Sequence, residues 1–205
     1  MADILILNKM HLSLWINKHE FMKYFSLLTV AGVLLFSACK SGNNSPKTAK
    51  EILEEAAPNM NAGAGKFTIE GPRGWTRIDT TLNGVKSTII LAPEATGGFR
   101  ANVNVVSENM GGNSLQTYFD KTVGAMEQYL EKFTVAGKGD KEINGIPAKW
   151  LKYTAVQSGK HVAAVLYIVP KNGVAYGITG ITKVGEEDKY FATFENTVST
   201  FKVTE

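Results

Sequence analysis

The side chains that most often perform catalysis are scarce in this sequence of 205 residues. Cys39 is the only cysteine, and of the three histidines only His161 follows it. Zinc sites and Cys-His nucleophiles need several such residues together, so the sequence excludes both. A Ser-His-Asp arrangement would have to use His161, and no Gly-x-Ser-x-Gly turn occurs anywhere. Carboxylates such as Asp79 and Glu108 would support an enzyme only if they met in one pocket. We therefore expect no enzymatic activity, no metal site and no cofactor.

Cys39 closes a segment that has the three parts of a secretory signal peptide. Lys23 supplies a basic start, residues 27–36 carry no charge, and small residues precede the cysteine. The apolar run is far shorter than the roughly 20 residues that a membrane-spanning helix needs. Phe36-Ser37-Ala38-Cys39 resembles the bacterial lipobox, whose cysteine is lipidated and becomes the new N-terminus. The alternative is a free thiol after an ordinary signal peptide, although an unpaired thiol would be a liability in an oxidising compartment.

This cysteine divides the chain into four parts. Residues 1–21 are an upstream extension if translation begins at Met22, and residues 22–38 form the signal peptide. Residues 39–65 are rich in small and polar residues around one short stretch of helix formers, which is typical of a linker. Residues 66–205 form the globular domain. Two or three acyl chains on the cysteine would tether the protein stably to a membrane without spanning it.

The size and net charge of the chain limit the kinds of partner that it could bind. Removing the first 38 of the 205 residues leaves 167, which is the size of one domain. The 22 basic and 19 acidic side chains become 19 and 17 after this removal, and the basic residues are scattered, so we expect no nucleic-acid binding. In enteric bacteria, an aspartate directly after the lipidated cysteine resembles a signal that retains lipoproteins in the inner membrane. This chain has Lys40 at that position. We therefore expect the protein to be anchored in the bacterial outer membrane and to face the periplasm.

Short runs of β-branched and aromatic residues, bounded by glycine or proline, predict a sheet. Three Asn-Gly pairs favour tight hairpins and hence antiparallel pairing. These pairs are Asn83-Gly84, Asn144-Gly145 and Asn172-Gly173. The predicted strands are residues 66–70, 75–80, 85–92, 99–107, 133–137, 147–157, 160–170 and 173–183.

Two segments instead have apolar residues at spacings of three and four, which predicts helices. They are residues 114–133 and a closing segment that runs from the acidic residues 186–188 to Phe201. Strands and helices thus fall into separate runs. This order predicts an α+β fold in which helices cover an antiparallel sheet.

Two groups of side chains are candidates for a surface that binds something. Asn102 and Asn104 share the polar side of a predicted strand, and we expect that side to be solvated rather than a binding site. Trp75 and Trp150 would more often fill a core. An exposed tryptophan rimmed by polar groups would instead mark a ligand or partner surface, so both remain candidates.

Phe67-x-Ile69-x-x-Pro72-x-Gly74-Trp75 resembles the opening of the PsbP-like family, which includes the Ran-binding Mog proteins and bacterial lipoproteins of the DcrB and LpqN type. The resemblance continues through Ile143-Asn144-Gly145-Ile146-Pro147-Ala148 and covers residues 66–203. It implies an antiparallel sheet sandwiched by α-helices, and an accessory or protein-binding role without shared catalytic residues. The features by which family members engage the photosystem or Ran are not recognisable in this sequence.

These observations predict an envelope lipoprotein that is anchored to the membrane through lipid on Cys39. Its domain is expected to bind another envelope protein. The alternative is a carrier of a small ligand or lipid, with a cavity between the sheet and the helices.

Overall fold

The computed structural model describes residues 66–82 and 85–204. The predicted signal peptide, Cys39, the linker and the Asn83-Gly84 turn lie outside these residues. The described elements are β1 (Lys66–Thr68), β2 (Thr76–Leu82), β3 (Val85–Leu91), β4 (Asn102–Asn109), α3 (Leu115–Tyr129), β5 (Glu131–Ile143), β6 (Ile146–Gln157), β7 (Lys160–Lys171), β8 (Val174–Lys183), α4 (Glu187–Ser199) and β9 (Lys202–Thr204).

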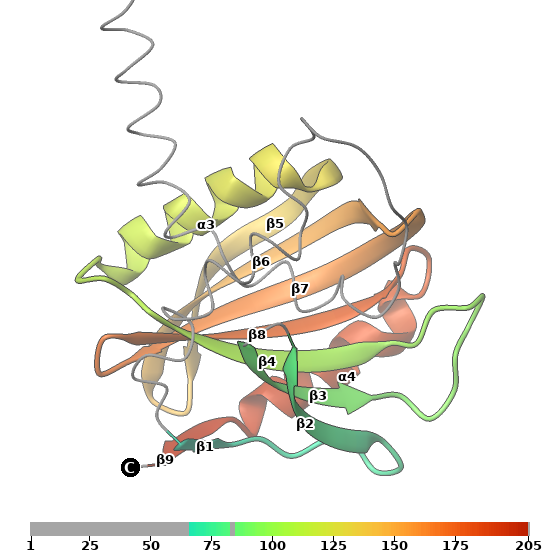
Figure 1. Cartoon of the computed structure of the whole chain (residues 1–205), viewed down its shortest axis with the longest axis horizontal. Helices are drawn as coiled ribbons and strands as arrows, with labels where there is room; N and C mark the ends of the chain where they lie inside the picture. Colours follow the sequence, from blue (N-terminus) through green and yellow to red (C-terminus); the bar gives the residue numbers. More distant parts are fainter. Residues whose placement is uncertain (1–65, 83–84, 205) are drawn as a thin grey trace, which may run out of the picture.

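A seven-stranded sheet, in the order β2-β3-β4-β8-β7-β6-β5, forms the centre of the domain (Figure 1). Each pair of neighbouring strands is antiparallel. Helix α3 carries the chain from β4 to the far edge of the sheet, and β5 to β8 then return by hairpins until β8 pairs with β4. The predicted antiparallel α+β fold is confirmed.

The hairpin turns follow the predicted Asn-Gly chemistry. Asn144 and Gly145 have φ angles of 50° and 79°, and Asn172 and Gly173 have 52° and 76°. Positive φ at both central residues is the geometry that matches the twist of antiparallel strands. Ser158-Gly159 forms a third turn of this kind, with φ angles of 49° and 73°, at a pair that the sequence analysis did not select.

The segment after the first helix differs from the prediction. Helix α3 ends at Tyr129, and β5 covers residues 131–143 instead of the predicted 133–137. The apolar alternation is interrupted there by Gly137, Gly139 and a run of charged residues. The sequence pattern therefore predicted a strand that is too short. As an edge strand, β5 has mostly exposed or half-buried side chains, and it needs no apolar face along its whole length.

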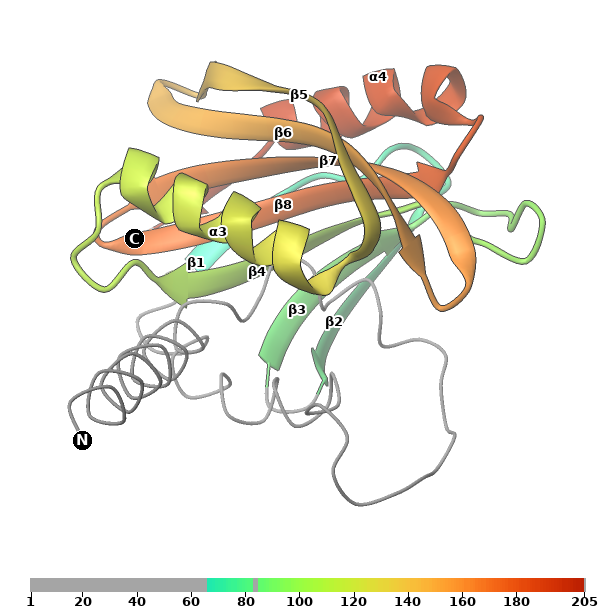
Figure 2. The ribbon, with the colours of Figure 1, turned by 90° about the horizontal axis from the view of Figure 1, so that it is seen from above.

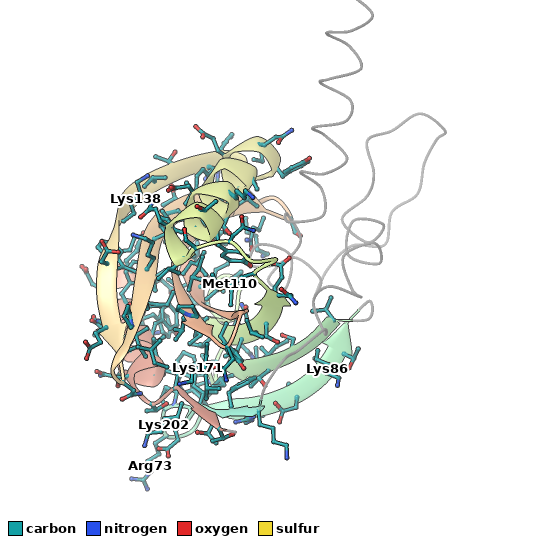
Figure 3. All side chains as sticks on the ribbon, turned by 90° about the vertical axis from the view of Figure 1, so that its left-hand side faces the viewer. Arg73, Lys86, Met110, Lys138, Lys171 and Lys202 are labelled. Atoms are coloured by element: carbon teal, nitrogen blue, oxygen red, sulfur yellow. The ribbon has the colours of Figure 1, made fainter. Side chains whose placement is uncertain are left out.

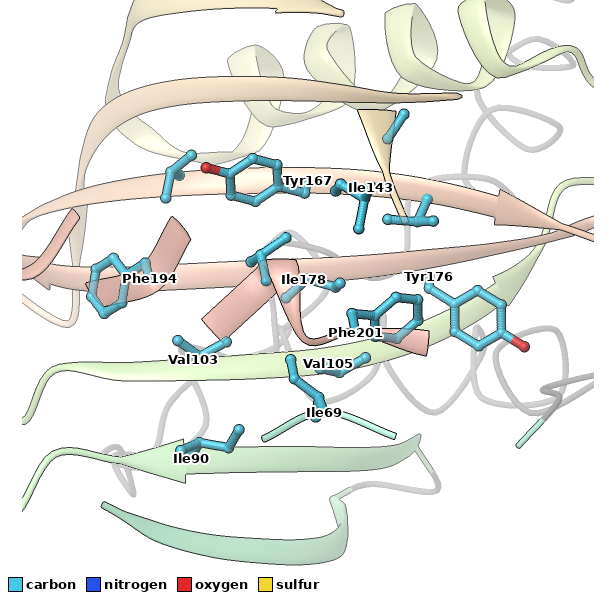
Figure 4. Packing of buried hydrophobic residues seen from close by; sticks show 14 of the residues in the cluster. Ile69, Ile90, Val103, Val105, Ile143, Tyr167, Tyr176, Ile178, Phe194 and Phe201 are labelled. Atoms are coloured by element: carbon cyan, nitrogen blue, oxygen red, sulfur yellow. The ribbon is translucent and has the colours of Figure 1, made fainter. Parts of the chain in front are cut away.

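Each face of the sheet has its own hydrophobic core, covered by one helix (Figure 2). Helix α3 packs over β5 and β6 on one face, where Phe119, Met126 and Leu166 are buried. Helix α4 packs over β7 and β8 on the other face, and its Phe194 is fully buried (Figure 4). The expected sandwich of a sheet between helices is therefore confirmed.

A separate two-stranded sheet of β1 and β9 lies on the α4 side. Phe67 of β1 fixes its position, because its ring contacts Tyr176 and Phe201 at centroid distances of 6.0 and 5.5 Å. This small sheet thus stands beside the part of the large sheet that α4 leaves uncovered. It brings the first described strand next to β2, β3 and β4.

Candidate binding site

A pocket of about 630 Å³ opens between β1 and the β2–β4 end of the large sheet. That volume lies within the range of about 300–1,000 Å³ that is typical of small-molecule sites. Its lining comprises Lys66, Phe67, Arg77, Asp79, Thr80, Thr81, Lys86, Ser87, Thr88, Val105, Val106 and Ser107. Apart from aliphatic and aromatic carbon, the described part of the lining therefore presents cations, hydroxyl groups and one carboxylate.

The alternation of side chains along a strand explains this composition. Arg77, Asp79 and Thr81 occupy every second position of β2 and so share one face. The register of β3 places Lys86 opposite Thr81 and Thr88 opposite Asp79 on that same face. The pocket floor is thus a polar patch on the sheet face that also carries α4.

Arg77 and Asp79 form the fixed centre of this patch. The Arg77 Nε and Nη2 atoms donate to the two Asp79 carboxylate oxygens, each at 3.1 Å, and Nη1 donates to the Ile69 carbonyl at 3.1 Å. The Thr88 hydroxyl donates to Asp79 Oδ1 at 2.6 Å. Hydrogen bonds from Arg77, and then from Thr88, hold the pKa of the Asp79 carboxyl below its ordinary value. This carboxylate is therefore a poor general base, and its role is to orient the guanidinium.

The two carboxylates that were considered for an enzyme do not meet. Asp79 lines the pocket, whereas Glu108 lies on the α3 face, 3% exposed, where it accepts a 2.5 Å hydrogen bond from the Tyr118 hydroxyl. Burial raises the pKa of Tyr118 well above its ordinary value, and the charge of Glu108 raises it further. Since the sheet separates Glu108 from Asp79, this pair cannot act on one substrate.

Trp75 lies at the α4 face and does not line the pocket. Its ring meets Tyr190 and Phe194 edge-on, at centroid distances of 6.1 and 6.3 Å. The side chain is half-buried. Its contacts are those of a residue that closes the core beneath α4.

Trp150 of β6 is also half-buried at the α4 face and outside the pocket lining. Its indole lies over Gly139 of β5, where an added Cβ would come within 3.0 Å of the indole nitrogen. The Lys152 ammonium lies 5.8 Å from the Trp150 ring and 5.5 Å from the Phe191 ring. The structure thus places both tryptophans around α4 but does not bring them together with the pocket.

The asparagines of β4 are not solvated, so that expectation is wrong. Asn102 is 8% exposed and Asn104 is 2% exposed. They alternate with Val103 as predicted, but their side of the strand faces the α3 core, where Asn102 lies opposite Ile181. Alternation assigned the faces of β4, but it did not show that both faces are covered.

Residues 66–82 and 85–204 contain no group of three or more His, Cys, Asp or Glu side chains placed to hold a metal ion. His161 is exposed at the start of β7 and lies outside the pocket lining. No helix of these residues has both the length and the apolar character to cross a membrane.

Some of the residues that form the pocket, but not the pocket itself, can be recognised from the sequence. The alternation of Arg77 and Asp79 in the predicted strand 75–80 is visible in the sequence. What local patterns do not show is that β1, 20 residues before Lys86, forms the opposite wall.

No protein-family model matches this chain, and no curated protein matches it. Solved structures do. LpqN of Mycobacterium tuberculosis, which is involved in cell envelope biogenesis, aligns with a TM-score of 0.58 at 12% identity, over 71% of this chain and 87% of LpqN. PA94 of Pseudomonas aeruginosa aligns with a TM-score of 0.53 at 15% identity, over 69% of this chain and 99% of PA94. Cyanobacterial PsbP from Synechocystis aligns with a TM-score of 0.44 at 15% identity, over 70% of this chain and 96% of its own.

The structural similarity to LpqN confirms the PsbP-like fold, because the family that this sequence resembles includes lipoproteins of the LpqN type. At such low identity the likeness concerns the fold alone. Function has to be argued from the residues of this chain.

Proposed function

We propose that this chain, which shares its fold with LpqN, is a membrane-anchored lipoprotein of the bacterial envelope with a non-catalytic binding domain. In this proposal Cys39 carries the lipid, and the lipid anchors the protein to the periplasmic side of the outer membrane. The domain then binds another envelope protein. The observation that carries the proposal is the pocket beside β1. Its groups are suited to binding, since its carboxylate is already engaged by Arg77 and Thr88.

The position of the pocket suits a tethered protein. Lys66, the first described residue, lines it, and 27 positions separate Lys66 from Cys39. A chain of that length spans at most about 95 Å when fully extended. A lipid on Cys39 would therefore hold the pocket within that distance of the membrane surface.

The anchor is tested by comparing the native chain with Cys39→Ser. We expect the native chain to incorporate labelled palmitate and to sediment with outer membranes, whereas Cys39→Ser should do neither. Ser37→Ala, which keeps a small residue before the cysteine, is the matched control and should behave as the native chain does. Label on Cys39→Ser, with its full retention in the membrane fraction, would contradict lipidation at this residue.

The binding role is tested by crosslinking in intact cells and affinity capture of the native chain. A protein recovered reproducibly across several detergents would support the role, provided that Arg77→Gln or Lys86→Gln reduces its recovery. Lys138→Gln, at an exposed position on β5, is the control that should leave recovery unchanged. Failure to recover any partner across detergents would count against a protein-binding role.

A small-ligand carrier is the second candidate function, and the volume of the pocket favours it. The cavity differs in place from the one expected, because β1 and the sheet form it rather than the sheet and the helices. Native mass spectrometry of the chain from cells would test this candidate. A retained ligand supports it, and a ligand-free spectrum under gentle conditions contradicts it.

A further inference from the structure

We infer that the pocket between β1 and β2–β4 binds a phosphate-bearing ligand, with Lys66, Arg77 and Lys86 meeting the anionic group. This inference rests on the binding role proposed above and names the chemistry of the ligand.

The first step is the charge of the lining. Among the described residues of the lining, three cations, Lys66, Arg77 and Lys86, accompany one carboxylate, Asp79, which gives these residues two net positive charges. Asp79 pairs with Arg77 and offsets its charge, so Lys66 and Lys86 supply the net positive charge. A concave surface of one sign of charge concentrates ligands of the opposite sign.

The second step is the orientation of Arg77. A guanidinium has five N–H groups. Among the described residues, the Arg77 bonds to Asp79 and to the Ile69 carbonyl use three of them, which leaves two for a ligand. The guanidinium is therefore held in place before a ligand arrives. Such fixed forks bind phosphate oxygens in pairs and with little further loss of side-chain entropy.

The third step is the supply of neutral donors. Thr81 lies on the same sheet face as Arg77 and Lys86, and Ser107 of β4 joins it in the lining, whereas the Thr88 hydroxyl already donates to Asp79. A phosphate has more oxygen acceptors than a carboxylate, so it can use cations and several hydroxyl groups at once. The mixture of donors in this pocket fits a phosphate better than it fits a carboxylate.

The fourth step is the space beside the polar groups. The pocket of about 630 Å³ is much larger than one phosphate, and the half-buried Phe67 adds apolar surface to its wall. A phosphate ester therefore fits better than the free ion, with its organic part against Phe67. A phospholipid headgroup and a soluble phosphate ester share this chemistry.

The test uses the full chain carrying Cys39→Ser, so that no lipid on the chain itself holds it to vesicles. Soluble binding is measured by calorimetry with glycerol 3-phosphate, and glycerol serves as the uncharged control. Headgroup binding is measured by sedimentation with phosphatidylglycerol vesicles, and phosphatidylcholine vesicles serve as the zwitterionic control. Lys66→Gln and Lys86→Gln are the pocket variants. Lys138→Gln is their matched control, because Lys138 lies at the opposite end of the sheet from Lys86 (Figure 3).

We expect saturable binding in at least one arm, weakened about fivefold or more by each pocket variant, as for the loss of a charge-assisted hydrogen bond. Lys138→Gln should stay within about twofold of the parent chain, as for a single exposed charge. All three lysines are exposed, so the variants should fold, and thermal unfolding checks this. Binding of glycerol 3-phosphate points to a soluble ligand, and binding confined to phosphatidylglycerol vesicles points to a headgroup.

Two outcomes would overturn the inference. One is the absence of binding in both arms. The other is an equal loss in Lys138→Gln and the pocket variants, which would mean that net charge alone drives binding. Neither outcome touches partner capture by the native chain, so failure of this inference and failure of the proposed binding role are distinguishable.

Discussion

Gly180 of β8 lies directly beneath the aromatic ring of Phe194 of α4, so that a Cβ at residue 180 would collide with the ring. Phe194 is fully buried, and its neighbours leave it no room to move. We expect Gly180→Ala to lower the free energy of unfolding by about 1–3 kcal/mol, which is the usual cost of overpacking a core. Chemical denaturation measures this change.

Gly124→Ala is the control for Gly180→Ala. Gly124 is an exposed residue within α3, and no atom lies within 4 Å of the position of its missing Cβ. Alanine there should raise the free energy of unfolding by about 0.5–1 kcal/mol, because it favours the helix. A loss of stability in Gly124→Ala as large as in Gly180→Ala would contradict the explanation by contact with Phe194.

Tyr118→Phe should destabilise the domain through Glu108. The substitution removes the hydroxyl that donates to a buried carboxylate. Loss of a hydrogen bond by a buried charged group costs about 1–3 kcal/mol. A double-mutant cycle of Tyr118→Phe with Glu108→Leu, which has no acceptor, measures the coupling between the two side chains. A coupling energy near zero would show that the hydrogen bond contributes nothing to stability.

Asn144→Gly should destabilise the domain more than Asn172→Gly does. Both asparagines adopt positive φ in hairpin turns, a conformation that glycine accepts readily. The Asn144 amide also donates to the carbonyls of Ser199 and Phe201, at 2.9 and 2.7 Å, and so joins the β5–β6 turn to the end of α4. Loss of these two bonds should cost about 1–3 kcal/mol. Equal unfolding midpoints for the two variants would rule out this cross-link as a source of stability.

The Asp79 carboxyl should titrate below its ordinary pKa of 3.8 in the folded protein, because Arg77 and Thr88 donate to the ionised form. A pKa that is lower in the folded state contributes stability above the unfolded-state pKa, and this stability is lost as pH falls through the folded-state value. The contribution should be small because the side chain is 63% exposed.

Carboxyl NMR signals followed from neutral to acidic pH would measure the Asp79 pKa. Arg77→Gln should return it towards 3.8, since the Arg77 side chain is the largest cause of the shift. Lys138→Gln should leave it unchanged. An Asp79 pKa that is the same in Arg77→Gln and in the parent chain would contradict the assigned cause.

Turn chemistry and alternation made most of the fold predictable. Asn144 and Asn172 fix two hairpins because few other residues accept positive φ, and a fixed turn sets the register of its strands. The extent of β5 was not predictable in the same way. A glycine such as Gly139 usually indicates a break in a strand. Here it lies within β5 because the Trp150 indole occupies the space that a side chain at residue 139 would need.

The candidate site was predictable only in part. Local alternation groups Arg77 with Asp79, but the pocket needs β1 as its second wall. That wall depends on pairing between Lys66 and Thr204, which are far apart in the sequence and share no local signal. For the same reason the burial of Asn104 was missed, since covering of the second sheet face is a property of the whole domain.

The pairing of β1 with β9 has a mechanical consequence. Tension transmitted along the chain from the residues before Lys66 is applied first to β1, which is held by three residue pairs to β9 and by the Phe67 ring. The long strands of the large sheet bear load only after this short one peels away. Because Lys66 and Phe67 form one wall of the pocket, peeling would dismantle the pocket while the sheet stays folded. Tension on the chain before Lys66 would thus release a ligand from the pocket.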